Sequence, residues 1–198
     1  MTLQEVLIAI TVLLIGLMLM TGNLITSHRT QATLDAFIQV HQEARRAIDR
    51  MSQELREAGN VNNNTDMAAA QRLDFQIARG YNATPVAQGG CGGTCWGSEQ
   101  AVNQWLHYAL DTTDANNPRL LRWITAGRLD ALPANFAGCQ VLANDVTPAL
   151  AQTAFTYDHP ARTVTIQLHT SITSRQLPGG TLGLPNSLIT RIRLRNTP

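Results

Sequence analysis

Residues 1–20, MTLQEVLIAITVLLIGLMLM, decide the fold of this chain. After Glu5 the stretch is apolar through Met20, with Thr11 and Gly16 as the exceptions. A helix needs about 20 apolar residues to cross the hydrocarbon core of a bilayer, so this segment has membrane length. Leu24 and Ile25 lie just beyond it, and we expect residues 1–25 to form the membrane segment. A carboxylate carried toward the bilayer centre costs about 2.5–3.5 kcal/mol on insertion scales, so the position of Glu5 demands a physical reason.

The flanks of this segment bear on its orientation and processing. The first basic residue is Arg29, so the positive-inside rule applied to this chain alone would keep the C-terminal part inside. A secretory signal peptide fits poorly, because the start lacks a positive region and residues 19–23 offer no small-x-small cleavage site. We interpret the chain as one whose basic leader has been removed. The alternative is an ordinary signal-anchored protein that begins at Met1.

The composition narrows the classes of function. The 198 residues suffice for one anchored domain, and the formal charge of +1 gives no reason to expect nucleic acid as the main partner. All 15 basic residues are arginines. In an oxidising compartment the cysteines Cys91, Cys95 and Cys139 predict one disulfide and one remaining thiol. Cys91 and Cys95 can close a small ring, and Cys139 can equally pair with either. A metal site of these cysteines with His107 has no recognised ligand spacing.

The helical pattern continues beyond the apolar segment. From Leu34 to Ala58 apolar residues recur at three- and four-residue steps, with charged residues on the other face, which predicts an amphipathic helix packed on a core. Gly59-Asn60 is the expected C-terminal stop. Joined to the apolar half, this gives one helix of nearly sixty residues and about 85 Å, with Gly16 and Gly22 as its weakest points.

The rest of the chain predicts antiparallel strands. Residues 61–97 are polar and glycine-rich and indicate a long loop around one short strand at 73–78. Residues 104–110 and 119–123 flank a turn rich in Asp, Asn and Thr and predict a hairpin. Further strands are expected at 141–146, 154–157, 163–169 and around Ile192 and Leu194. The predicted class is therefore α+β, with the amphipathic half of the helix (1–58) covering one face of an antiparallel β-sheet head (59–198).

These features together resemble the type IV pilin superfamily. The resemblance rests on Met1-Thr2-Leu3-x-Glu5, the apolar helix, its amphipathic continuation and the C-terminal sheet. The strand-rich head is similar to minor pilins of the PilW type and to the J-type pseudopilin of type II secretion. Position 1 is usually Phe in the family and is Met1 here, and Gly22 replaces a common helix-kinking proline.

The resemblance implies how such a chain is processed and where it resides. It implies a leader cut by prepilin peptidase, methylation of the Met1 amine and a single pass through the bacterial inner membrane with the head in the periplasm. Incorporation into an extracellular pilus would follow, with residues 1–25 as the filament-core segment. Its partners would be other minor pilins, the major pilin and the inner-membrane assembly platform. In the filament the amino end of one subunit would neutralise the Glu5 carboxylate of its neighbour, so that two buried charges become tolerable together. The alternative is a Glu5 that reaches the headgroups of an ordinary anchor.

Other chemistry finds less support in the sequence. Arg191, Arg193 and Arg195 form a basic stripe on one strand face, which either contacts a ligand or DNA or, more commonly, is a solvated edge that discourages strand addition. The five histidines show no metal or catalytic pattern, and Ser98 and Ser187 lie in no nucleophile elbow. We expect no enzyme activity, cofactor or metal. A minor pilin is the main prediction, with a J-type pseudopilin and an anchored adhesin or DNA-binding module as alternatives.

Overall fold

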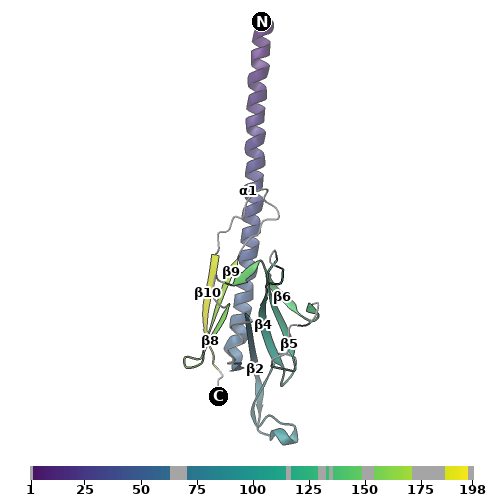
Figure 1. Cartoon of the computed structure of the whole chain (residues 1–198), viewed down its shortest axis with the longest axis vertical. Coiled ribbons are helices and arrows are strands. Elements are labelled where there is room, and N and C mark those ends of the chain that lie inside the picture. The colour runs from purple at the N-terminus through teal and green to yellow at the C-terminus, as the bar shows by residue number, and fades with distance from the viewer. Residues whose placement is uncertain are drawn as a thin grey trace.

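A single long helix dominates the molecule. The computed structural model describes residues 2–62, 71–114, 117–128, 133, 136–148, 154–170 and 186–195. Helix α1 (Leu3–Glu57) is unbroken over 55 residues, about 80 Å at 1.5 Å per residue. Its first half projects away from the head and its second half passes through it (Figure 1). The predicted α+β class and the single continuous helix are confirmed.

Two antiparallel sheets build the head. The larger has the order β1-β2-β4-β5-β6, with β3 also paired to β2, and the smaller has the order β10-β9-β7, with β8 also paired to β9. The strands of the larger sheet are β1 (Ala58–Val61), β2 (Arg72–Asn82), β3 (Gly93–Gly97), β4 (Trp105–Asp111), β5 (Arg119–Thr125) and β6 (Gln140–Asn144). Those of the smaller sheet are β7 (Val146–Pro148), β8 (Phe155–Asp158), β9 (Thr163–Thr170) and β10 (Asn186–Arg193).

The core forms where α1 meets both sheets. The buried stripe of the helix consists of Ala44, Ala47, Ile48, Met51 and Leu55, spaced at three and four residues as an amphipathic helix requires. In β9 the alternation predicted from sequence holds, because Val164, Ile166 and Leu168 are fully buried. These residues join Leu73 and Phe75 of β2 in one hydrophobic cluster. The head and the second half of the helix therefore share a core.

The hairpin was predicted correctly, and the glycine-rich region was not. β4 and β5 pair antiparallel from Trp105–Thr125 to Asp111–Arg119. The predicted loop with one short strand at 73–78 is wrong, because β2 runs for 11 residues to Asn82 and β3 returns along it. Of the glycines that indicated a loop, Gly89, Gly90 and Gly92 lie in the connection between these strands, and Gly93 begins β3. The connection also holds a short 3₁₀ helix, η1 (Val86–Gln88). Tertiary pairing therefore outweighs local composition here.

Two boundaries also differ from expectation. The expected glycine stop of α1 is absent, since Ala58 caps the helix in an extended conformation and Gly59 already belongs to β1. The single strand expected at 141–146 is divided at Asp145, whose φ of 54° is left-handed. This break moves the chain from β6 in one sheet to β7 in the other. It creates the second sheet that the sequence did not predict.

Candidate functional site

The projecting half of α1 carries most of the exposed large apolar side chains in the part of the chain that the structure describes. A window of 18 residues near the N-terminus is apolar enough to cross a membrane and contains no buried residue, so it fits a membrane span or a signal sequence. Leu34 and Ile38, well beyond one bilayer-length from the start, are still about half exposed. The exposed large side chains before them are Leu3, Val6, Leu7, Ile8, Ile10, Val12, Leu13, Leu14, Ile15, Leu17, Met18, Leu19, Met20, Leu24 and Ile25.

Glu5 has a partner in its own chain. The backbone N–H of Thr2 donates a hydrogen bond to Oε2 of Glu5 at 2.9 Å, as in the capping box of a helix N-terminus. Sequence reasoning missed this contact, although a Thr three residues before a Glu is its signature. Met1 lies outside the described residues, so its methylation and its pairing with Glu5 of a neighbour stay predictions. In the single chain the carboxylate is held at the helix start.

A polar cluster joins the second half of α1 to the larger sheet. Glu54 accepts hydrogen bonds from the Tyr108 hydroxyl at 2.5 Å and from Nε of Arg122 at 3.2 Å. Arg122 also donates to Glu99 at 2.5 Å, and Arg50 pairs with Glu54 one helical turn away. Burial and the neighbouring Glu54 carboxylate raise the pKa of Tyr108 well above its usual range. These contacts fix how the helix is oriented on the head, because each buried polar group requires its partner.

The outer face of the larger sheet carries a second buried polar network. His107 is fully buried, with Nδ1 2.6 Å from Oδ1 of Asp74 and Nε2 2.6 Å from the Thr125 hydroxyl. The Trp123 ring stacks on His107 with 5.0 Å between centroids. The Thr125 hydroxyl donates a hydrogen bond to the carbonyl of Gly127 at 2.8 Å, which links the network to the segment that follows β5. Sequence reasoning found no partner for His107, because its partners come from different strands.

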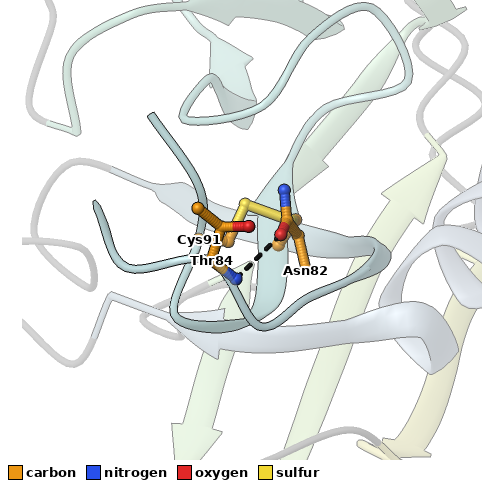
Figure 2. Close-up of a disulfide and its surroundings, with 4 residues drawn as sticks. Asn82, Thr84 and Cys91 are labelled. Atoms are coloured by element: carbon orange, nitrogen blue, oxygen red, sulfur yellow. Dashed lines mark hydrogen bonds between the residues drawn. A yellow bond between two sulfur atoms is a disulfide. The ribbon is translucent and has the colours of Figure 1, made fainter. Parts of the chain in front are cut away.

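The cysteines separate into one bonded pair and one thiol. Cys91 and Cys95 form a disulfide with 5.2 Å between their Cα atoms, which settles the pairing that the sequence left open. Figure 2 shows this bond beside the turn at Asn82, whose side-chain oxygen accepts the N–H of Thr84 at 2.9 Å. Cys139 is a free thiol packed with the Trp123 cluster, and burial raises its pKa.

The predicted arginine stripe lies along β10 and the residues after it. Ile192 and Leu194 are buried, while Arg191, Arg193 and Arg195 are exposed, as the alternating pattern predicts. Together with Arg56 and Arg162 they line a cavity of about 620 Å³ beside the end of α1. The stripe is thus part of a larger basic groove. Among the described residues, no group of three His, Cys, Asp or Glu side chains could hold a metal ion.

The geometry corresponds to a pilin-like architecture, in which a long apolar N-terminal helix is packed by its second half on an antiparallel sheet. Comparisons with protein-family models, with curated proteins and with solved structures found no match. The functional argument therefore depends on the helix and the head themselves.

Proposed function

We propose that this chain is a minor pilin, a structural subunit that enters a type IV pilus through the apolar half of α1. One observation carries the proposal, namely that the bare half and the packed half belong to one unbroken helix. Burying a large aliphatic side chain contributes about 1.5–3 kcal/mol, so the exposed row on this half favours transfer out of water strongly. A membrane satisfies this preference before assembly, and a bundle of similar helices satisfies it afterwards.

The length of the bare surface favours a filament over a simple anchor. A bilayer core takes up about 20 helical residues, yet Leu34 and Ile38 expose about half of their surface further along the helix. An isolated anchor would leave these side chains in water, whereas neighbouring helices in a bundle would cover them. A helix continuous with the head also presents every head at a fixed angle to the bundle axis, which suits regular packing of subunits.

The free-energy cost of placing the Glu5 carboxylate in lipid supports the same proposal. In lipid the carboxylate is expensive even with its Thr2 contact, because a hydrogen bond to a neutral N–H does not remove its charge. A neighbouring amino terminus in the filament would supply the opposite charge. The partners proposed are other minor pilins, the major pilin and the assembly platform. A J-type pseudopilin of type II secretion would use the same helix.

Mass spectrometry of sheared filaments tests the function. Filaments are sheared from cells that produce the full chain, purified, and digested for peptide identification. We expect this chain to co-purify with other pilin-like subunits and to yield an N-terminal peptide that begins at a methylated Met1. Co-isolation with secretion-machine subunits would assign the pseudopilin function. Recovery only in the membrane fraction, with a longer unprocessed N-terminus, would contradict both.

A further inference from the structure

Strand β10 has an edge that no described strand covers. It pairs with β9 along its whole length, and β9 carries β7 and β8 on its other side. The N–H of Leu194 donates to the carbonyl of Arg162 across this ladder. Because backbone groups alternate between the two sides of an antiparallel strand, those of Ile189, Arg191 and Arg193 point away from β9. These are the groups that an additional strand would bind.

A basic groove runs beside this edge. The cavity of about 620 Å³ lies between the last turns of α1 and β10. Of the nine residues in the described part of the chain that line it, five are arginines and none is acidic. A second cavity of about 380 Å³ continues it toward the start of β10 and shares Thr190 with it. Here Ile48, Leu188 and Ile189 make the lining more apolar, with Arg45 and Asp49 opposite. The groove is therefore strongly positive at one end and mixed at the other.

The strand presents its charges at regular intervals. Arg191, Arg193 and Arg195 are exposed on one face, and the residues between them are buried on the other. Alternate residues of a strand are about 6.6–6.8 Å apart, which is the backbone spacing of Arg191 and Arg193, and Arg195 follows just after the end of β10. We call these three side chains the arginine row. On a strand added alongside, side chains of one face would stand about 4.5–5.5 Å from this row. Acidic residues at every second position would match it.

We propose that β10 is a docking edge for an extended segment of a different protein, with acidic side chains at alternate positions and apolar ones between them. Backbone hydrogen bonds to Ile189, Arg191 and Arg193 would supply affinity, and the arginine row would select the acidic face. A second copy of β10 is disfavoured, because two such edges would bring arginines together. This inference goes beyond the proposed function and does not depend on it.

Two other occupants fit the groove less well. Sites for single-stranded nucleic acid combine a basic groove with aromatic side chains for base stacking, and among the described residues that line the two cavities none is aromatic. Lipid headgroups of the membrane that α1 enters are also remote. Ser52, which lines the basic cavity, is 49 residues after Leu3 on the same helix, about 75 Å along its axis.

Peptide binding to the full chain in detergent micelles tests the docking edge. The probe is a fluorescein-labelled octapeptide in which Glu and Val alternate, followed by fluorescence anisotropy. Three control peptides are a Lys-Val alternation, four Glu followed by four Val, and the probe sequence with an N-methylated backbone. We expect the probe to bind in a salt-sensitive manner and each control to bind at least tenfold more weakly. Equal binding of the clustered or the N-methylated peptide would overturn the proposal, since charge alone would then suffice.

Variants of the protein locate the interaction. Replacing Arg191 and Arg193 by Glu should weaken binding of the probe peptide at least tenfold. Arg79→Glu, a charge reversal at an exposed position on β2, should change this affinity by less than twofold. Ile189→Pro removes an N–H at the open edge without removing a ladder hydrogen bond, and should reduce binding at least tenfold relative to Ile189→Ala. Circular dichroism checks that each variant folds. Unchanged binding of the arginine double variant, or competition by an equal charge of single-stranded oligonucleotide, would overturn the assignment.

Discussion

The two halves of α1 differ in their environment although they form one helix. Met18 in the first half exposes 75% of its surface, and Met51 in the second half exposes none. Residues 6–20 of the first half are apolar around the whole circumference, apart from Thr11 and Gly16, as expected for a helix in lipid or in a bundle. The second half has a single buried apolar stripe. The two halves should therefore contribute differently to the stability of the head, because only the second half packs against it.

A matched pair of methionine substitutions should show the largest difference between the two halves of the helix. Met51→Ala should lower the free energy of unfolding of the head by about 2–5 kcal/mol, because it leaves a cavity in the core. Met18→Ala should change it by less than about 0.5 kcal/mol, because the Met18 side chain is largely exposed to solvent. Denaturant unfolding of the full chain in detergent, followed by tryptophan fluorescence, measures both. Equal losses would contradict the division of the helix into a packed half and a bare half.

Acid should weaken the packed half through Glu99. Burial raises the pKa of this carboxyl, but the hydrogen bonds it accepts and the Arg122 charge outweigh burial and lower it below the ordinary 4.5. The contribution of Glu99 to the free energy of unfolding is therefore present above about pH 4.5, and it is lost as the pH falls through the lower pKa of the folded state. We expect Glu99→Gln to flatten the fall in unfolding free energy between pH 4.5 and 3.

Asp35, an exposed carboxylate of α1 next to the exposed Leu34, provides the control for this titration. Asp35→Asn changes the same charge without touching Arg122, so it should leave the wild-type slope in place. Denaturant titrations at several pH values compare the three proteins. If both substitutions flattened the curve alike, general charge repulsion rather than the Glu99 contact would explain the acid dependence.

Gly22→Ala should give the smallest effect, and it changes only the projecting half of the helix. A Cβ at position 22 would meet nothing within 4 Å apart from its chain neighbours and the backbone of its own helix, and Ala favours a helix over Gly by about 1 kcal/mol. Amide hydrogen exchange around this residue should slow by up to about fivefold in detergent, while unfolding of the head stays unchanged. A change in head stability would show that the two halves are coupled more closely than their contacts indicate.

The sequence predicted what depends on periodicity. The 3.6-residue pattern of α1 and the alternation in β9 each identify a buried face, and burial of that face is what folds the segment. The β4–β5 hairpin is local and could likewise be recognised from its turn. The length of β2 could not, because its continuation past Ala78 is stabilised by pairing with β3, which follows a glycine-rich connection.

The polar contacts were harder to predict because their partners are remote in sequence. His107 meets Asp74 and Thr125 only after β2, β4 and β5 are aligned, and Arg122 reaches Glu54 across 68 positions. The docking edge of β10 also required the sheet topology, although the arginine row itself was visible. The Glu5 capping contact, by contrast, was local and recognisable.

Replacement of Glu5 is the most direct test of assembly through the bare half of α1. Two variants are compared with wild type for the amount of the chain in the membrane and in sheared filaments. Glu5→Ala removes both the charge and the Thr2 contact, whereas Glu5→Gln removes the charge and retains an acceptor for Thr2. An unpaired partner charge costs about 3–5 kcal/mol when buried. Both variants should therefore reach the membrane normally and fall at least tenfold in filaments, whereas wild-type recovery of Glu5→Gln in filaments would contradict the account.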